Sequence, residues 1–250
     1  MLSIIKTRLK QGCRTIKFPD RGFPLPKNYL GKPVIKKCSK CQKCQTICPV
    51  SCISESNNGI SIDIGKCIFC RKCFQVCEEG AIQFEKTYEL AEFSRSNLIY
   101  STEMKKQESL LNKEIKRVFG RSLKLRQVSA GGCNACEADC NVLETVGWDM
   151  GRFGIQFVAS PRHADAILIT GPITKNMELA LKKTYDALAS PKLVITVGAC
   201  AISGGIFAES SEVLCGVKKF YNVDLYIPGC PPHPATILHG LLKLIGKISE

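Results

Sequence analysis

The 250-residue sequence predicts two domains: a small, cysteine-rich α+β domain, followed by a larger α/β domain built on a doubly wound parallel sheet. Three observations predict this arrangement. A string of four cysteines occurs twice in the first third, short apolar runs alternate with helical patterns in the second half, and 45% of the residues are apolar, enough for one good core and a smaller one. The 16 cysteines have spacings that usually bind metal in a reducing compartment, so we expect no disulfide framework.

The first 30 residues are predicted to form a basic N-terminal arm. Its start places Met1, Ile5 and Leu9 on one helical face, with basic residues opposite. Since this start lacks a long apolar core and a small-residue cleavage site, we do not expect a signal peptide. No window approaches eighteen consecutive apolar residues, so we do not expect a transmembrane helix either.

The net charge of +13 is concentrated near the N-terminus. Residues 1–50 contain twelve Lys or Arg and one acid, Asp20, whereas the remaining 200 residues contain 23 and 21. A basic arm of this kind suits an anionic membrane surface or an acidic partner at least as well as RNA. Since the rest of the chain is nearly balanced in charge, we do not expect nucleic acid as a partner.

The cysteine-rich part is an internal duplication. The segment KCSKCQKCQTICPVSCIS from Lys37 recurs 29 residues later, from Lys66, as KCIFCRKCFQVCEEGAIQF. Each half reads Cys-x2-Cys-x2-Cys-x3-Cys. The cysteines are Cys38, Cys41, Cys44 and Cys48 in the first repeat, and Cys67, Cys70, Cys73 and Cys77 in the second.

The spacing within each repeat predicts an iron-sulfur cluster. Three thiolates two residues apart wrap a loop around three corners of a cube, and the fourth points away toward the cluster of the other repeat. We therefore expect Cys48 to join the second repeat's triplet and Cys77 to join the first. The alternative is structural zinc, which prefers four ligands in two pairs, whereas this string supplies eight thiols in two interlocked quartets. The predicted ligand sets are Cys38, Cys41, Cys44 and Cys77 for one 4Fe-4S cluster, and Cys67, Cys70, Cys73 and Cys48 for the other.

Residues 31–87 resemble bacterial-type two-cluster ferredoxins, which implies an α+β ferredoxin-like domain with two 4Fe-4S clusters. Pro49 follows Cys48, whereas Glu78 stands at the matching place after Cys77. Because that proline shapes a turn and binds no iron, we expect the difference to affect only the polarity around the second cluster. Cys52 falls where the second repeat has Ala81, and we interpret it as a small buried core residue.

Residues 88–120 are predicted to form a helical linker between the domains. YELAEF (88–93) and KKQESLLNKEIKRVFG (105–120) read as helical, the second with apolar residues near one face and Gly120 as a stop.

Residues 121–250 are predicted to form the α/β domain. Strands that alternate with helices favour a parallel, doubly wound, flavodoxin-like sheet, in which ligands collect at the carboxyl ends of the strands. The apolar strand candidates are LKLRQV (123–128), GIQFVAS (154–160), ADAILIT (164–170), KLVITVG (192–198) and VDLYIPG (223–229), and the helix candidates are MELALKKTYDAL (177–188) and ATILHGLLKLIG (235–246).

Four further cysteines follow strands of this sheet. Cys133 and Cys136 come after LKLRQV, Cys200 after KLVITVG, and Cys230 at the end of VDLYIPG, so three loops at one sheet edge bring four thiols together. Glycines in these loops allow close approach to a bulky cofactor. Four thiolates also satisfy zinc, so this group by itself leaves the metal open. Of the remaining cysteines, Cys13 and Cys215 are interpreted as ordinary thiols and Cys140 as an alternative fourth ligand.

These loops carry a recognisable pattern. GGCNAC (131–136), RFGIQFVASPRHADAILITGP (152–172), VGACAISGGIF (197–207) and IPGCPPHP (227–234) resemble the small subunit of group 4 membrane-bound nickel-iron hydrogenases, including formate hydrogenlyase, and its homologue in respiratory complex I. NYLGKP (28–33), KCIFCRKC and YELAEF resemble a ferredoxin subunit of formate hydrogenlyase. The chain therefore resembles a fusion of two neighbouring subunits.

The resemblance implies a third 4Fe-4S cluster, the proximal one, held by the residues that match its motif: Cys133, Cys136, Cys200 and Cys230. It also implies a large subunit that carries the nickel-iron centre. Complex I relatives typically have two adjacent cysteines in the first motif, so Cys-Asn-Ala-Cys favours the hydrogenase branch.

Several other residues near these motifs have open roles. Hydrogenase relatives usually have a glutamate where this chain has Asp139, flanked by Glu137. We therefore do not assign a proton-relay role to Asp139, and a solvated or helix-capping Asp is a nearly equal alternative. His233 is predicted either to hydrogen-bond a cluster sulfur or line an interface, or simply to pack. His163 is interpreted as a loop tether and His239 as a structural residue.

The function we expect is electron transfer within a membrane-associated hydrogenase, through three 4Fe-4S clusters, with no catalytic residue in this chain. The implied partners are a nickel-iron large subunit, membrane-arm subunits, and a donor or acceptor such as ferredoxin or a formate dehydrogenase, and the implied location is the cytoplasmic face of the membrane. The alternatives are a complex I-like relative whose partner lacks nickel, a free ferredoxin-like carrier, and a zinc-stabilised nucleic-acid protein.

Overall fold

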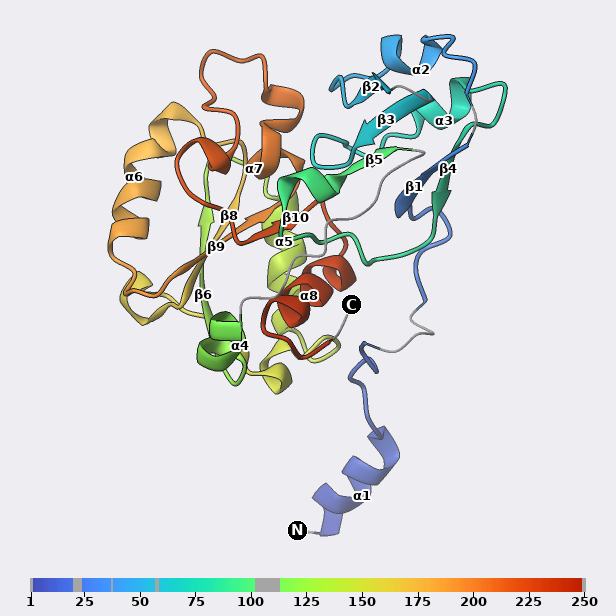
Figure 1. Cartoon of the computed structure of the whole chain (residues 1–250). Helices are drawn as coiled ribbons and strands as arrows, with labels where there is room; N and C mark the ends of the chain where they lie inside the picture. Colours follow the sequence, from blue (N-terminus) through green and yellow to red (C-terminus); the bar gives the residue numbers. More distant parts are fainter. Residues whose placement is uncertain (1, 20–23, 37, 57–58, 102–112, 249–250) are drawn as a thin grey trace.

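The computed structural model describes residues 2–19, 24–36, 38–56, 59–101 and 113–248. Figure 1 shows a small domain beside a larger one, with helix α1 (Leu2–Gln11) standing apart from both. All residues of α1 are exposed, including the apolar side chains of Leu2, Ile5 and Leu9. Within the described residues, no helix combines the length and the apolar character that crossing a membrane requires.

The small domain repeats one structural unit. Each cysteine loop leads into a short helix and then a strand: α2 (Lys43–Thr46) and β2 (Ile53–Ser56) in the first half, α3 (Lys72–Val76) and β4 (Ile82–Glu85) in the second. The strands pair across the halves in two antiparallel sheets, β1–β4 and β2–β3–β5. The remaining strands are β1 (Lys32–Ile35), β3 (Gly59–Asp63) and β5 (Ile99–Ser101).

We expected a helical linker at residues 88–120, and for residues 88–101 this is wrong. Leu90 and Ala91 are buried in an extended stretch, a 3₁₀ turn, η1 (Arg95–Leu98), follows, and β5 then pairs with β3. The apolar side chains of this stretch fill two different cores, because the chain passes between the domains here. Of the second helical stretch, α4 (Lys113–Phe119) is present, and the part before residue 113 lies outside the described residues.

The larger domain contains the predicted parallel sheet. Its order is β10-β9-β8-β6-β7 and all four pairings are parallel. Counted from β6 as the first strand, this is the doubly wound order 2-1-3-4-5 with its switch point between β6 and β8. The strands are β6 (Leu123–Ser129), β7 (Ile155–Phe157), β8 (Ala166–Thr170), β9 (Leu193–Val197) and β10 (Leu225–Ile227).

Helices cover both faces of this sheet. On one face α5 (Ala135–Asn141) and α8 (Pro234–Leu244) enclose a core around Leu125, Leu168 and Ile195. On the other face α6 (Lys175–Asp186) and α7 (Ala199–Ser203) enclose a core around Ile167, Ile169 and Val194. All residues of β8 and β9 are buried, as central strands covered on both faces should be. Short 3₁₀ turns make up the remaining elements, η2 (Val142–Glu144), η3 (Met150–Phe153), η4 (Pro161–His163), η5 (Gly205–Phe207) and η6 (Val217–Lys219).

The two domains are joined at the edge of the parallel sheet. Glu92 forms an antiparallel bridge with Tyr226 of β10, so the extended stretch covers that edge strand. Glu92 is 2% exposed and its carboxylate lies 3.8 Å from Nζ of Lys243 on α8. A Cβ at Gly240 of α8 would lie 2.7 Å from the Ala91 side chain, so this contact is tightly packed.

Candidate functional site

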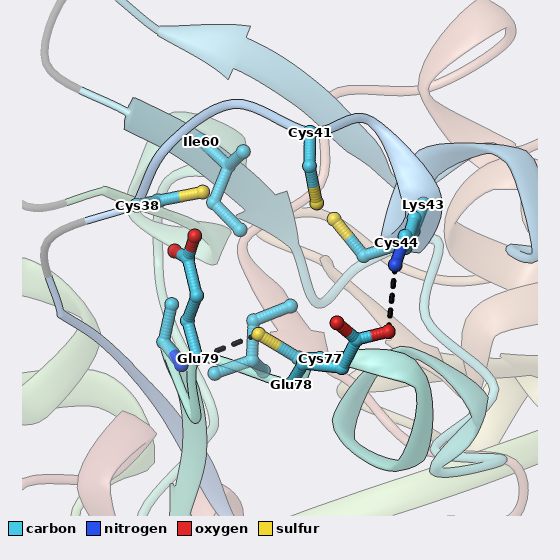
Figure 2. Close-up of a pocket in the computed structure, with 10 residues that line it drawn as sticks. Cys38, Cys41, Lys43, Cys44, Ile60, Cys77, Glu78 and Glu79 are labelled. Carbon is cyan, nitrogen blue, oxygen red and sulfur yellow. Dashed lines mark hydrogen bonds and ion pairs between the residues drawn. The ribbon is translucent and has the colours of Figure 1, made fainter.

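The first group of thiols surrounds a pocket between the two repeats. Cys38, Cys41, Cys44 and Cys77 line it, and Figure 2 shows their sulfurs facing one shared space. Lys40 and Gln42 adopt left-handed conformations, with φ of 61° and 60°, which turn the loop so that its three thiols point the same way. The fourth thiol comes from the other repeat, as the spacing predicts. The ligand role of these thiols stays a prediction.

The second group has the same construction. Cys48, Cys67, Cys70 and Cys73 line a pocket, again three thiols from one repeat and the fourth from the other. Phe69 and Arg71, 29 residues after Lys40 and Gln42, have φ of 54° and 67°. The duplication therefore repeats the backbone conformation as well as the cysteines.

Backbone N–H groups donate to the sulfurs in both groups. Lys40 N–H donates to Cys38 Sγ at 3.3 Å, and Phe69 N–H donates to Cys67 Sγ at 3.3 Å. The fourth thiols receive matching bonds, from Cys52 N–H to Cys48 Sγ at 3.4 Å and from Ala81 N–H to Cys77 Sγ at 3.3 Å. Such donors favour the thiolate, which is the form that binds iron.

The second pocket contains a fifth thiol. Cys52 is 5% exposed, and its Sγ lies 3.4 Å from Cys48 Sγ. Its thiol hydrogen bond lowers the pKa of Cys48 to about 5 and also lowers the pKa of Cys67. Burial raises the pKa of Cys73 to about 12. Cys52 is buried, as predicted, but its side chain lines the thiol pocket, and the sequence pattern does not indicate this contact.

The acid after Cys77 lies at the first pocket. Glu78 and Glu79 line that pocket, and Glu78 accepts a hydrogen bond from Lys43 Nζ at 2.6 Å (Figure 2). We expected Glu78 to change the polarity around the second site, and this is wrong. Cys77 lines the first pocket together with three thiols of the first repeat, so the residues that follow Cys77 lie there too. The ion pair is largely exposed and contributes little to stability.

The third group lies at the carboxyl end of the parallel sheet. Cys133 and Cys136 follow β6, Cys200 follows β9, and Cys230 follows β10. Burial, then the charges of Cys230 and Cys133, raises the pKa of Cys200 to about 11, so these thiols lie within electrostatic range of one another. Burial is also the main cause that raises the pKa of Cys136, and Cys200 and Cys230 contribute.

Two glycines allow the third group to form. A Cβ at Gly198 would lie 2.6 Å from Cys136 Sγ, and one at Gly205 would lie 2.8 Å from Cys200 Sγ. Both glycines have positive φ, 91° and 57°. Only a residue without a side chain fits these positions. The predicted use of glycine for close approach in these loops therefore agrees with their geometry.

The sulfur atoms surround an open space and do not converge on a single point. Within the described ranges, no group of three or more His, Cys, Asp or Glu side chains lies close enough to hold a metal ion. Thiol-only donors, N–H groups aimed at the sulfurs and shared pockets fit the requirements of a bulky iron-sulfur cube in the small domain.

A buried carboxylate lies beside the third group. Glu137, next to Cys136, is 6% exposed and accepts hydrogen bonds from Ser129 Oγ at 2.5 Å and Thr170 Oγ1 at 2.6 Å. From the sequence, Glu137 is noted only as an acid close to Asp139. The signal that points to it is an acid one position after Cys136 in the first turn of α5, beside two strands that end in the hydroxyl residues Ser129 and Thr170. Asp139 is half-buried, and burial raises its pKa.

The other cysteines and histidines lie in varied surroundings. Cys140 is fully buried in the apolar core under α5, whereas Cys13 is exposed and Cys215 hydrogen-bonds the Ala208 carbonyl at 3.0 Å. His233 Nδ1 accepts from Ala235 N–H at the start of α8, and its ring lines the pocket that contains Cys230. His163 is exposed.

His239 is half-buried on α8 against the stretch that connects the two domains. Its ring lies 5.4 Å from that of Tyr88, centroid to centroid, and burial lowers its pKa to about 4. Glu89 Oε1 is 3.9 Å from Nε2, but a neutral imidazole makes no ion pair, so we treat this contact as packing.

The second and third groups approach each other across the domain contact. Ile68 and Phe69 line both the second thiol pocket and a neighbouring pocket that contains Cys230. The Cys67 charge contributes to raising the pKa of Cys230, after burial and Cys133. The second group therefore lies between the first, with which it shares the repeats, and the third.

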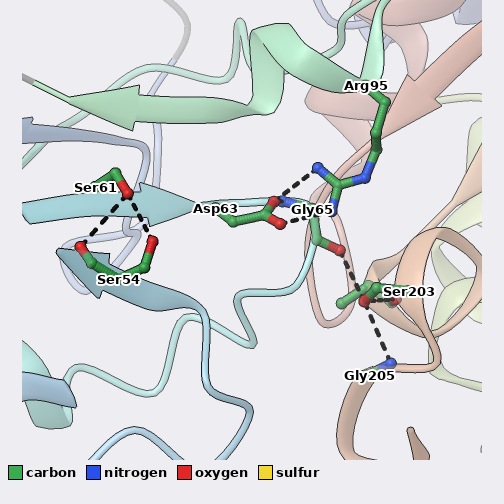
Figure 3. A network of polar contacts seen from close by, with 8 residues as sticks. Ser54, Ser61, Asp63, Gly65, Arg95, Ser203 and Gly205 are labelled. Atoms are coloured by element: carbon green, nitrogen blue, oxygen red, sulfur yellow. Dashed lines mark hydrogen bonds and ion pairs between the residues drawn. The ribbon is translucent and has the colours of Figure 1, made fainter. Parts of the chain in front are cut away.

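A polar network links the loops of these two groups. Arg95 donates to both carboxylate oxygens of Asp63, at 2.8 and 2.6 Å, and Gly65 N–H also donates to Asp63 (Figure 3). Ser203 Oγ lies 3.2 Å from the Gly65 carbonyl, which stands two residues before Cys67, and Ser203 stands three residues after Cys200. This contact joins the second and third sites through hydrogen bonds.

Two family models match the chain. Residues 133–244 match "NADH ubiquinone oxidoreductase, 20 Kd subunit", and residues 37–82 match "4Fe-4S dicluster domain". These ranges contain all twelve predicted ligands.

Relatives align with about half of the chain. A Pyrococcus furiosus protein described as "Probable membrane-bound hydrogenase subunit mbhJ" is 38% identical over 134 residues, which cover 54% of this chain and 80% of the relative. Formate hydrogenlyase subunit 7 of Escherichia coli is 42% identical, over 52% of this chain and 51% of its own length. A subunit of the NADH-quinone oxidoreductase of Phocaeicola vulgatus is 46% identical, over 52% of this chain and 66% of its own length. With its sheet, its thiol-bearing loops and these relatives, the chain belongs to the family of the 20 kDa subunit of NADH ubiquinone oxidoreductase, which includes hydrogenase subunits, and carries a 4Fe-4S ferredoxin-type domain before it.

Proposed function

We propose that this chain binds three 4Fe-4S clusters and relays electrons along them to or from the nickel-iron site of a hydrogenase large subunit. One observation carries the proposal: three groups of four thiols, of which the second lies between the other two. When bound, each cluster supplies a one-electron store. The predicted ligand sets are Cys38, Cys41, Cys44 and Cys77; Cys48, Cys67, Cys70 and Cys73; and Cys133, Cys136, Cys200 and Cys230.

Residues of this chain hold the clusters and form their surroundings. The thiols hold the clusters, the backbone donors at Lys40, Phe69, Cys52 and Ala81 tune them, and Ile68 and Phe69 place apolar side chains between the second and third sites. The chain supplies spacing and environment, and the catalytic step belongs to the partner.

The surface at the third site supports a partner that covers it. Cys133 and Cys230 are exposed, and Ile206 and Phe207, in the loop after Cys200, are 56% and 40% exposed. A low-potential cluster in such a position needs protection from solvent and an acceptor close by. We infer that the large subunit docks here. We further infer that the whole chain is peripheral on the cytoplasmic face of the membrane, with the membrane-arm subunits of a formate hydrogenlyase-like complex and with ferredoxin or a formate dehydrogenase as electron source.

The test is anaerobic purification with the neighbouring subunits, followed by metal analysis and electron paramagnetic resonance. We expect about twelve irons per chain, nickel in the large subunit, and three cluster signals that hydrogen reduces. Eight irons, with the spectra unchanged by Cys200→Ala or Cys230→Ala, would contradict the proposal. Twelve irons with a nickel-free partner would instead support the complex I-like alternative, which the NADH-quinone oxidoreductase relative favours.

A further inference from the structure

The internal repeat places a thiol side chain at the second thiol site where the first has a methyl group. Cys52 and Ala81 occupy equivalent positions, and both donate their backbone N–H to the fourth thiol of a site, at 3.4 and 3.3 Å. Both are buried, at 5% and 1% exposure. At this pair of positions the backbone donors therefore match, and only the side chain differs.

The Cys52 side chain adds a sulfur donor to the second site. Its Sγ lies 3.4 Å from Cys48 Sγ and within hydrogen-bond reach of Cys67. The predicted set of four ligands is complete without it, so Cys52 is not needed to hold iron. A thiol has a single hydrogen, so it donates to one of the two sulfurs at a time.

Two other roles for Cys52 make different predictions. As a packing residue it would fill the same small space as Ala81 and would affect only stability. As a fifth ligand it would be required for iron content. Since a hydrogen bond to a ligand sulfur stabilises the more negative, reduced cluster, a donor would affect the reduction potential instead.

We propose that Cys52 is a positioning residue that donates its thiol hydrogen to the ligand sulfurs of the second site, Cys48 and Cys67, and makes that cluster easier to reduce than the cluster of the first site. This rests on the proposed iron-sulfur function. The second site lies between the other two. An electron that passes along the relay then occupies the second cluster in preference to the first.

The repeat also provides the matched experiment. Cys52→Ala gives the second site the alanine that the first has at this position, and Ala81→Cys gives the first site the cysteine of the second. Each full-length variant is reconstituted anaerobically, its iron is counted, and its clusters are titrated by electron paramagnetic resonance at controlled potential. Cys52→Ser, which keeps a hydrogen donor of similar size, is the conservative control.

We expect Cys52→Ala to keep full iron and to lower one midpoint only. At the wild-type midpoint of that cluster, the ratio of reduced to oxidised cluster should fall about threefold to tenfold, the range of one net hydrogen bond. Ala81→Cys should raise the midpoint of the other cluster, and Cys52→Ser should stay near wild type. Full iron with unchanged midpoints in Cys52→Ala would overturn the proposal, and so would loss of about four irons, which would make Cys52 a ligand. A wild-type chain without clusters would instead overturn the proposed function.

Discussion

The two domains bring four thiols together by opposite routes. In the small domain, three thiols of each group lie within seven residues of one another, and left-handed residues at fixed places turn them inward. In the large domain, the thiols come from three loops between residues 133 and 230, and only the order of the parallel strands makes them neighbours.

This difference changes what each group depends on. The small-domain groups depend on local backbone conformation and on one crossed cysteine from the other repeat. The third group depends on the sheet and on glycines at points of close approach, so changes far from the thiols in sequence should affect it.

The largest expected effect tests the crossing between repeats. Cys38→Ala combined with Cys77→Ala should remove about four irons, because both thiols serve one cluster, whereas Cys38→Ala combined with Cys48→Ala should remove about eight. Iron analysis of the anaerobically reconstituted chain measures this. The reverse result would show that each repeat holds its own cluster with its own four cysteines.

The next prediction tests whether the third group can be disrupted while the other two groups remain intact. Gly198→Ala should remove about four irons and leave the small-domain clusters intact, because its Cβ would lie 2.6 Å from Cys136 Sγ at a φ of 91°. Gly147→Ala is the matched control, since the nearest atom to its Cβ would be 4.0 Å away. Full iron content in Gly198→Ala would show that the third group does not need this close approach.

A smaller effect tests the Arg95–Asp63 ion pair, which joins η1 to β3 next to the Gly65–Ser203 contact. Arg95→Met should destabilise the chain by about 3 kcal/mol, because Asp63, with 15% of its side chain exposed, loses its charge partner. Adding Asp63→Asn should restore part of that loss, which a double-mutant cycle in denaturant measures. Magnetic interaction between the second and third clusters should weaken in Arg95→Met. An unchanged interaction would show that this network does not fix their spacing.

The smallest effect concerns pH. His239 has a folded-state pKa of about 4, below its usual value near 6.5, so the unfolded chain binds more protons and stability falls as pH drops through 6.5 toward 4. Between pH 7 and 5.5 this loss should be about 1 kcal/mol. His239→Phe keeps an aromatic ring against Tyr88 and should remove that part of the pH dependence of the anaerobic unfolding midpoint. Equal pH slopes in both proteins would show that His239 does not titrate in this range.

Much of the fold could be predicted because the signals are local or follow from strand order. The β8 and β9 strands are apolar runs and β6 mixes apolar with polar residues, and the carboxyl ends of β6 and β9 place the Cys133 and Cys200 loops at one edge. Residues 88–101 could not be predicted, since their apolar side chains fill two cores and only the packed domains distinguish an extended bridge from a helix.

The repeat, the thiol spacing and the alternation of strands and helices can be predicted without the structure, because each depends on residues close together along the chain. Four contacts depend on the packing of the folded chain: Cys52 faces Cys48, Glu78 lies at the first pocket, buried Glu137 accepts hydrogen bonds from two hydroxyls, and Ser203 hydrogen-bonds Gly65. These contacts join residues from different elements or direct a side chain into a particular pocket, and no local spacing specifies the packing that places them.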